Sequence, residues 1–436
     1  MSEKEFLAKA LESKGLEPGD LVEVVSSDGR MLQGILMPHH EFSGGDIVTI
    51  KLGSGYNVGM RLRDPDAIRL IMKAETGKPL KAKIMTSSKA GGRSALPKIS
   101  IVSTGGTIAS YVDYRTGAVK PAITADELAR SVPELADICT PKSEVLYSIL
   151  SENMRPKNWS ELAERIADHL NSGSMGCIVP HGTDTMGYTG AALAFSLSNL
   201  TGPVVLVGSQ RSSDRPSSDS TLNLLSAARV CLDADLGEAV VLMHSGPDDE
   251  VCTIHRGTRV RKCHSSRRDA FETINGAPLG SVEGGRILLS ADHEKRSNGK
   301  VLSDPRFDDN VAMLNFYPGL TAAKLRKYSD GASGLVIAGT GLGHVHQELI
   351  AEIARLTADD IPVCVTTQCI GGSVNLNVYS TGRDMLKAGA IQLGDMLSET
   401  AFVKLSWVLG HTDDIGKCRE MMLLDMRREM GLRRPL

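Results

Sequence analysis

Two turns in the sequence place threonine hydroxyls directly after short apolar runs. The first is Thr104-Gly-Gly-Thr107 and the second is Gly182-Thr-Asp-Thr185. Glycines let the backbone turn sharply and approach a ligand without interference from a Cβ atom. Because the carboxyl ends of parallel strands share one edge of a sheet, where ligands bind, the two turns could face one substrate. Each turn alone could also be a tight connection whose threonine caps the next helix.

The chemistry that such hydroxyls could perform is attack on a carbonyl carbon. An amide carbonyl requires a nucleophile, a route for protons and a place for developing negative charge. Thr107 could supply the nucleophile, and Tyr114 or Lys262 could remove its proton. Lys262 follows Arg259 and Arg261 closely, and cationic neighbours favour a neutral, basic lysine. The same segment could also be an exposed basic strand without a catalytic role.

The elements that must position these residues alternate between strand and helix from residue 98 onward. This alternation predicts a doubly wound parallel sheet, and its restart after about residue 300 predicts a second, smaller α/β domain. The glycine turn at 339–343 lacks dinucleotide spacing, and no phosphate-binding loop occurs. Strands are expected at 99–103, 176–180, 203–207, 238–243, 335–338 and 362–367, and helices at 124–131, 158–171, 185–198, 219–232 and 345–356.

The N-terminal part has a different pattern. A short amphipathic helix at 2–13 precedes alternating runs separated by turn residues, including the hairpin signal Asp28-Gly29, which predicts a small SH3-like β-barrel. The barrel could be a docking module or a stabilising appendage. Its strands are expected at 21–25, 31–37, 47–52 and 68–72.

A basic stretch at 73–98 follows the predicted barrel and contains glycine and proline, as linkers do. It could contact RNA phosphates or could be solvated, and the same alternatives hold for the arginine-rich end of the chain, which follows a predicted final helix. We therefore divide the chain into a barrel at 1–85, a linker at 86–97, an α/β domain with the site at 98–300 and a second α/β domain at 301–436.

Composition limits the other function classes. The chain has 436 residues, 41% of them hydrophobic, and a net charge of -3, which gives no overall attraction to nucleic acids or membranes. The eight cysteines lie without a Cys-x-x-Cys pair, which predicts reduced, buried thiols and no metal site. The charged N-terminus does not resemble a signal peptide, and no apolar run is long enough to span a membrane. We expect a cytoplasmic protein.

The two threonine turns together resemble the signature sequences of the bacterial-type asparaginase/glutaminase family. Val207-Gly-Ser-Gln-Arg211 and Gly257-x-x-Val-x-Lys262 also match, so the resemblance covers about residues 98–436. It implies an asparaginase-like fold of two α/β domains. It also implies that Thr107 is the nucleophile with Tyr114 beside it. Thr183, Asp184 and Lys262 match a second catalytic group of the family. Because that group also contains a threonine, Thr183 ranks second as the nucleophile.

The family's substrates are free amino acids, which carry an ammonium and a carboxylate. Asp184 could pair with the ammonium, while Ser151 and the backbone N–H groups at Gly182 could hold the carboxylate. Gly106 would let the first turn approach the same ligand. Glu152 departs from the glutamine usual in the family, and it either adds an acid near the ammonium or is merely exposed.

An N-terminal barrel with a basic linker is similar to one subgroup of the family, the D subunits of archaeal glutamyl-tRNA(Gln) amidotransferases. The segments 264–271 and 366–372 also look like that subgroup. The resemblance implies a glutaminase subunit without its own cofactor that passes ammonia to an E subunit, which amidates Glu-tRNA(Gln) with ATP and Mg. It further implies a homodimer within a heterotetramer, with tRNA contacted mainly by the partner. A free-standing L-asparaginase and a non-catalytic RNA-binding scaffold are the alternatives.

Overall fold

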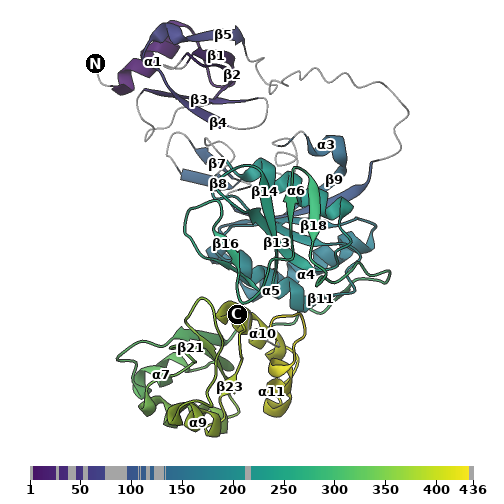
Figure 1. Cartoon of the computed structure of the whole chain (residues 1–436), viewed down its shortest axis with the longest axis vertical. Coiled ribbons are helices and arrows are strands. Elements are labelled where there is room, and N and C mark those ends of the chain that lie inside the picture. The colour runs from purple at the N-terminus through teal and green to yellow at the C-terminus, as the bar shows by residue number, and fades with distance from the viewer. Residues whose placement is uncertain are drawn as a thin grey trace.

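The computed structural model contains three units that follow one another along its long axis (Figure 1). A small β unit lies at one end, a large α/β unit in the middle and a smaller α/β unit at the other end. Thr107, Tyr114, the helix predicted at 124–131 and most of the predicted linker lie outside the residues that the structure describes. The described residues are 3–25, 29–37, 46–52, 57–73, 96–106, 108, 110–113, 118–121, 132, 134–211 and 218–431.

The N-terminal unit is a five-stranded antiparallel sheet with the strand order β4-β3-β2-β1-β5, which confirms the predicted small β domain. Its elements are α1 Glu3–Ser13, β1 Leu21–Val25, β2 Met31–Leu36, β3 Ile47–Lys51, β4 Asn57–Arg61, η1 Pro65–Ala67 and β5 Ile68–Met72. Val22 and Ile50 of the sheet and Leu7 of α1 share one core. Strand β4 was not predicted because it has Gly59 at its centre.

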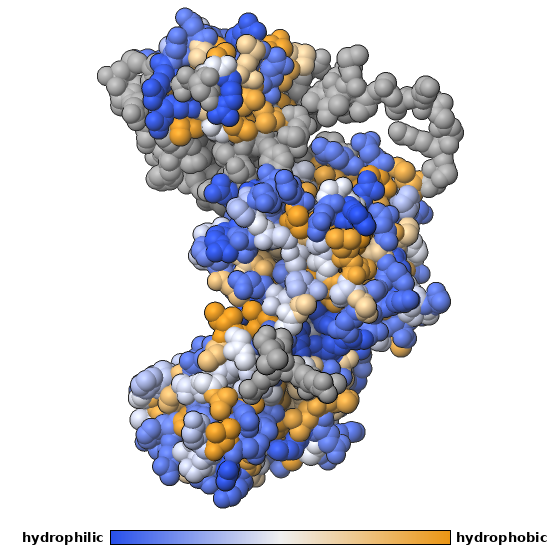
Figure 2. All heavy atoms as spheres, viewed as in Figure 1, coloured by the Kyte–Doolittle hydropathy of each residue, from blue (hydrophilic) through white to orange (hydrophobic). Residues whose placement is uncertain are grey.

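Figure 2 shows apolar residues gathered along one side of the N-terminal unit, while apolar and hydrophilic residues are interspersed over the two α/β units. Strand β5 lies at the edge of its sheet and leaves Leu70, Ile71 and Met72 exposed. An unpaired edge strand can pair with another chain unless something covers it. Strand β5 therefore presents an exposed apolar edge of this unit.

The central unit is built on an eight-stranded sheet with the order β18-β17-β14-β13-β12-β10-β6-β9. Its elements are β6 Lys98–Gly105, β7 Ser110–Asp113, β8 Ala118–Pro121, α3 Leu135–Ile138, β9 Thr140–Ile149, η3 Ser151–Asn153, α4 Pro156–Asn171, β10 Cys177–Pro180, α5 Met186–Ser196, β11 Leu197–Ser198, β12 Val204–Val207, α6 Ser220–Asp233, β13 Ala239–His244, β14 Val251–Arg256, β15 Val260–Lys262, β16 Phe271–Thr273, β17 Gly280–Glu283, β18 Arg286–Leu289 and β19 Leu302–Ser303. Ile99 and Ile101 pack on the layer of α6, whereas Val102 and Val179 pack on the layer of α4 and α5. The period of two along these strands buries both faces of the sheet.

In this sheet β9, β6, β10, β12 and β13 run parallel to one another, as the alternating pattern predicts. Strands β14, β17 and β18 extend one edge in antiparallel order. Strand β9 was not predicted because its sequence is mostly polar. It lies at the other edge and is only half buried, so it needs no continuous apolar run.

The C-terminal unit has a four-stranded parallel sheet with the order β20-β21-β22-β23. Its elements are β20 Val311–Asn315, α7 Ala322–Tyr328, β21 Gly334–Gly339, η4 Gln347–Leu349, α8 Ile350–Ala358, β22 Val363–Thr367, α9 Ser380–Lys387, β23 Ile391–Gln392, α10 Ser398–Leu409 and α11 Ile415–Leu423. Helix α8 begins later than predicted because the short η4 precedes it. Trp159 and Phe195 of the central unit share a core with Trp407 of α10, so the two α/β units pack through apolar residues.

The cysteines are unpaired, and six of the eight are buried. Burial raises the pKa of Cys139 to about 11, which disfavours the reactive thiolate. This agrees with the predicted reduced thiols, although Cys369 is exposed. Among the described residues, none of the helices has the length and apolar character needed to cross a lipid bilayer.

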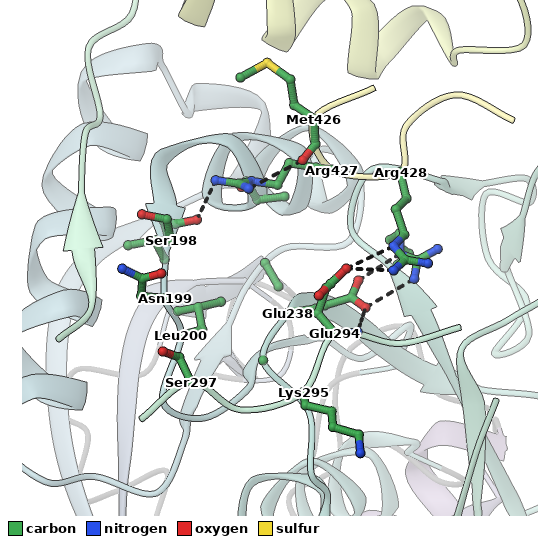
Figure 3. Close-up of a pocket in the computed structure, with 15 residues that line it drawn as sticks. Ser198, Asn199, Leu200, Glu238, Glu294, Lys295, Ser297, Met426, Arg427 and Arg428 are labelled. Atoms are coloured by element: carbon green, nitrogen blue, oxygen red, sulfur yellow. Dashed lines mark hydrogen bonds and ion pairs between the residues drawn. The ribbon is translucent and has the colours of Figure 1, made fainter. Parts of the chain in front are cut away.

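The terminal segment, residues 424–431 after α11, returns to the central unit and holds the two α/β units together. The solvated alternative does not hold for Arg427, whereas the Arg428 side chain remains 41% exposed. Arg427 donates to the Ala194 backbone oxygen at the end of α5 at 2.6 Å, and Arg428 donates to Glu294 at 2.7 Å. Figure 3 shows both arginines beside a cavity of about 320 Å³ that is also lined by Ser198 and Glu238.

A buried ion pair fixes this terminal segment to α10. Lys404 Nζ donates to Glu429 Oε1 at 2.5 Å, and both side chains are fully buried. Burial raises the pKa of Glu429. The Lys404 ammonium and hydrogen bonds from the Met426 and Arg427 backbone lower that pKa by a larger amount, so the net shift is downward. The carboxylate therefore stays ionised where no water reaches it.

We expect Glu429→Ala to lower the free energy of unfolding by about 3–5 kcal/mol, because it leaves the Lys404 charge buried without its partner. Chemical denaturation measures this loss. The double variant Lys404→Met, Glu429→Leu serves as the control, since it removes both charges and should lose much less stability. Equal losses in the two variants would contradict the explanation.

Candidate active site

The two predicted turns meet at the carboxyl edge of the central sheet. Gly106 has a φ of +86°, and a Cβ atom on it would lie 2.3 Å from the Gly182 backbone nitrogen. A Cβ atom on Gly182 would lie 2.7 Å from the Ser151 Cβ. Only glycine lets these three segments pack so closely. Thr107 directly follows Gly106 in the sequence, but it and Tyr114 lie outside the described residues.

Thr183, Asp184 and Lys262 come together although they are distant in the sequence. Lys262 Nζ donates to Thr183 Oγ1 and to Asp184 Oδ1, each at 2.8 Å. The Lys262 side chain is 12% exposed, whereas that of Asp184 is 68% exposed. The alternative of an exposed basic strand therefore does not hold at Lys262, whose ammonium lies between a hydroxyl and an open carboxylate.

Small residues bring Lys262 to this place. A Cβ atom on Gly187 of α5 would lie 3.1 Å from the Val260 backbone oxygen, and one on Gly190 would lie 3.2 Å from the Gly257 Cα. Helix α5 can therefore pack against the backbone that leads into β15. Since Thr183 precedes α5 and Lys262 ends β15, this close packing sets the distance between their side chains.

The C-terminal unit holds the other side of the same strand. Arg259 donates to Asp395 at 2.8 Å, and Arg261 pairs with Glu399 at 3.1 Å. The expectation that these arginines crowd the Lys262 ammonium is therefore wrong, because acidic residues of the C-terminal unit pair with both. Instead, the arginines anchor the β15–β16 hairpin to that unit.

A buried chain of hydrogen bonds orients the second turn. Trp159 Nε1 donates to Thr189 Oγ1 at 3.1 Å, Thr189 Oγ1 lies 2.9 Å from His181 Nε2, and His181 Nδ1 lies 2.7 Å from the Gly182 oxygen. A neutral imidazole with its proton on Nδ1 satisfies every member of this chain. Because a trans peptide points its C=O and N–H in opposite directions, the Thr183 N–H points away from His181.

A second polar network, at the end of β12, was not predicted as part of the site. Asn223 donates to the Gly208 oxygen at 2.9 Å, and the Asp219 carboxylate accepts from the Gln210 backbone N–H at 3.0 Å. A Cβ atom on Gly208 would lie 2.8 Å from the Thr183 methyl carbon. The segment 207–211 was noted only as a motif, yet together with Asp219 it supports the turn from behind.

The predicted substrate-binding residues border the same edge. Ser151 is buried at the start of η3, and its backbone oxygen accepts from Thr185 Oγ1 at 2.7 Å. Glu152 follows it and is exposed, as is Asp184. Ser151, Glu152 and Asp184 could bind the charged groups of an amino acid. Within the described part of the chain, no three His, Cys, Asp or Glu residues form a group that could hold a metal ion.

Three family descriptions match the chain. "Asparaginase, N-terminal" matches residues 98–295, "Glutaminase/Asparaginase C-terminal domain" matches 310–422, and "GatD N-terminal domain" matches 16–71. The matched ranges include most of the central unit, of the C-terminal unit and of the N-terminal sheet.

Similar proteins cover nearly the whole chain. The D subunit of the glutamyl-tRNA(Gln) amidotransferase of Pyrococcus furiosus is 49% identical over 96% of both chains, and that of Saccharolobus islandicus is 44% identical over 100% of this chain and 98% of its own. Among solved structures, the thermostable L-asparaginase of Thermococcus kodakarensis has a TM-score of 0.68 and 33% identity over 77% of this chain and 99% of its own. L-asparaginase I of Vibrio cholerae has a TM-score of 0.68 and 28% identity over 78% and 100%. The predicted asparaginase-like fold is confirmed.

We expect His181 to make stability depend on pH. Burial lowers its pKa from 6.5 to about 4, so between these values the unfolded chain binds a proton that the folded chain does not. Stability should therefore fall as the pH drops from 6.5 toward 4, by up to about 3 kcal/mol from this residue. Urea unfolding of the wild type and of His181→Gln at pH 7 and pH 4.5 measures this contribution.

On acidification, His181→Gln should lose less stability than the wild type. His346→Gln, a change at an exposed histidine, controls for the substitution itself. An equal loss in the wild type and in His181→Gln would contradict the assignment.

Proposed function

The chain belongs to the asparaginase-like family formed by the D subunits of glutamyl-tRNA(Gln) amidotransferases, and we propose that it hydrolyses glutamine to supply ammonia for amidation of Glu-tRNA(Gln). The family relationship supports a glutamine-hydrolysing amidotransferase subunit. The observation that carries the chemistry is the contact of the Lys262 ammonium with Thr183 Oγ1 at the carboxyl edge of the sheet.

In the proposed reaction a threonine hydroxyl attacks the side-chain amide carbon of glutamine. The C–N bond breaks, the nitrogen leaves as ammonia after taking up a proton, and a glutamyl ester remains on the threonine. Water then cleaves the ester and gives glutamate. Thr107 is the first candidate for the attacking residue, with Tyr114 beside it, and Thr183 is the second.

Lys262 is suited to carry protons between these steps. Its ammonium donates to Thr183 Oγ1 and is held by Asp184. From there it can give a proton to the departing nitrogen and recover one from the attacking water. Only 12% of the lysine side chain is exposed, and this limited contact with water strengthens its electrostatic effect on the reacting atoms.

Substrate recognition follows from the charged groups at the edge. Asp184 uses one carboxylate oxygen for Lys262, which leaves the other for the substrate ammonium, and Glu152 adds a second acid nearby. Ser151 and the Thr183 N–H suit the substrate carboxylate. Gly106 and Gly182 allow both turns to reach the ligand.

The remaining steps belong to a partner. We propose that an E subunit receives the ammonia and uses ATP and Mg to amidate Glu-tRNA(Gln), which it binds for the most part itself. This chain then needs no cofactor, and it acts as a homodimer within a heterotetramer in the cytoplasm. The match of residues 16–71 to the GatD N-terminal domain supports this assignment over that of an enzyme without a partner.

A free-standing L-asparaginase is the second candidate function. The solved structures named above are L-asparaginases, and they align with the two α/β units. The two candidates differ in the length of the substrate side chain by one methylene group and in whether an RNA-bound partner controls the rate.

We expect Thr107→Ala, Thr183→Ala and Lys262→Met each to lower kcat for glutamine hydrolysis by about 1,000-fold or more, because each removes a group that acts on the reacting atoms. Ammonia release measures the rate, and a melting curve checks the fold. Lys387→Met is the matched control, since Lys387 is a 79% exposed lysine on α9 of the C-terminal unit, and it should leave kcat unchanged. Activity like that of the wild type in Lys262→Met would refute the assigned role.

Ammonia release from glutamine and from asparagine should distinguish the candidate functions. We expect glutamine hydrolysis to rise strongly when the E subunit, Glu-tRNA(Gln) and ATP are added. Fast asparagine hydrolysis by the chain alone, unchanged by tRNA, would establish the asparaginase instead. If neither amide were hydrolysed and the chain bound RNA tightly, the non-catalytic RNA-binding scaffold would be the function.

A further inference from the structure

A groove with an apolar floor and an acidic rim lies on the α6 side of the central unit. It has a volume of about 770 Å³ and is formed by α3, α6 and the turns that join β13 to β14 and β17 to β18. Figure 1 shows α3, α6 and β18 together on one side of the central unit. The apolar lining residues, which are partly or fully buried, are Ile138, Leu222, Leu225, Val251 and Val282.

Acidic side chains outnumber basic ones along the rim of this groove. The acids are Glu134, Asp137, Asp249, Glu250 and Glu283. Among the described residues, Asp249 alone of these five has an ion pair, with Arg268 at 2.6 Å. The one basic lining residue, Arg229, lies 3.8 Å from Asp233 of its own helix. The groove therefore presents an unbalanced negative charge.

Glu134 also carries an unsatisfied acceptor. Its Oε2 atom is buried and has no hydrogen-bond partner among the residues that the structure describes. A buried carboxylate oxygen without a donor costs free energy. Because Glu134 lines the groove, an occupant that brings N–H donors to it would supply the missing partner. The groove thus combines apolar surface with acceptors for a cation.

The chain enters the central unit beside this groove. The Thr140 N–H donates to the Pro97 oxygen at 2.8 Å, and Thr140 Oγ1 donates to the Leu96 oxygen at 3.4 Å. Thr140 is only two residues beyond Ile138, which lines the groove. The segment that precedes Leu96 is therefore attached close to the groove.

That segment has a composition complementary to the groove. Residues 74–95 lie outside the described part of the chain, and their sequence contains five basic residues and one acid. Its run Lys78-Pro-Leu-Lys-Ala-Lys-Ile-Met85 combines lysines with apolar residues. Opposite charge and apolar surface on both sides favour association of this run with the groove.

We propose that residues 78–85 dock in this groove of their own chain and tether the N-terminal unit close to the central unit. In an extended chain, residues at even spacing share a face, so Leu80 and Ile84 both lie on the apolar floor. Lys81 and Lys83 reach the rim acids along their apolar stems. This assignment concerns the architecture of the chain, and it does not depend on the proposed amide chemistry.

The length of the intervening chain permits this docking. The ten residues 86–95 span at most about 35 Å when extended, and the chain enters the central unit two residues from the groove. At the other end, Lys73 is held to the N-terminal unit by Asp20 at 3.0 Å. Since Lys73 is five residues before Lys78, docking would keep this anchor within about 18 Å of the groove.

Zero-length crosslinking tests the contact in the intact chain. A water-soluble carbodiimide joins a lysine to a carboxylate only where the two groups touch. We expect crosslinks from the lysines of 78–85 to the rim acids, identified by mass spectrometry. The exposed pair of Lys14 and Asp66, 3.0 Å apart, is the positive control. Crosslinking of the control pair without any link between 78–85 and the groove would overturn the proposal.

Proteolysis gives a second readout. The combined variant Asp137→Asn, Glu250→Gln, Glu283→Gln removes three rim charges and leaves the floor unchanged. We expect trypsin to cut after Lys83 about tenfold faster in this variant than in the wild type, because cleavage requires the undocked form. Cleavage after Lys89 should proceed at one rate in both proteins, since Lys89 lies outside the docked run.

A second triple variant controls for the loss of three charges. Asp330→Asn, Asp413→Asn and Glu420→Gln neutralise exposed acids of the C-terminal unit, and together they should leave cleavage after Lys83 as slow as in the wild type. A melting curve verifies that both triple variants fold. Equal rates after Lys83 in the wild type and in the groove variant would overturn the docking.

Crosslinking of a mixture of isotope-labelled and unlabelled chains identifies which chain supplies the occupant. Crosslinked peptides that each carry one isotope composition support docking within one chain. Peptides that combine the two compositions would place the segment of one copy in the groove of another and would overturn the assignment to its own chain. Neither readout requires glutamine hydrolysis, so failure of the proposed function would leave this test intact.

Discussion

The contact between the Lys262 ammonium and the Thr183 hydroxyl is the constraint on which much of the architecture depends. The Lys262 side chain is only 12% exposed, and an ammonium largely withdrawn from water is costly unless its hydrogen-bonding partners are in place. These partners lie 78 and 79 residues before it in the sequence. Thr183 and Asp184 precede α5 of the central unit. Lys262 ends a strand whose arginines are held by Asp395 and Glu399 of the C-terminal unit. The contact itself lies within the central unit, and the C-terminal unit braces the strand that carries Lys262.

The two α/β units are accordingly joined in more than one way. Apolar side chains of α4, α5 and α10 form a shared core. The terminal segment adds polar contacts, since the Arg428 backbone oxygen accepts from Arg259 Nε at 2.9 Å, and Arg427 donates to the end of α5. Arg259 thus contacts both the terminal segment and Asp395. The position of Lys262 is defined from three directions, which limits how far it can move from Thr183.

The sequence was informative where function requires particular residue types in a fixed order. The threonine turns and Lys262 could be identified because glycine, hydroxyl and cation recur at motif spacing, and the parallel strands could be identified from continuous apolar runs such as 203–207. Strand β9 and the antiparallel edge could not be identified in this way. The side chains of β9 and of the outermost antiparallel strand β18 are only partly buried, so their pattern resembles that of a loop.

The supporting residues were harder to predict for another reason. Asp395 lies more than 130 residues beyond Arg259, and nothing local in the sequence marks their pairing. Asn223 of α6 and His244 of β13 are fully buried, and their burial alone would be unfavourable. Only the folded chain shows that each has its partner. Predicting such networks requires knowing which distant segments meet, and hydrophobic periodicity does not contain that information.

The floor and the rim of the site differ in a way that matters for control. On the floor, the chain from Trp159 through His181 to Gly182 satisfies its donors and acceptors without water, and the glycine contacts leave no room for displacement. Such a closed network resists change, because breaking any link leaves a buried polar group unpaired. At the solvent-facing rim of the site, Asp184 is exposed and charged, and so is Arg267 in the loop between β15 and β16. A ligand can exchange its own contacts for theirs at little cost, so regulation of this edge should enter through the rim while the floor keeps the geometry.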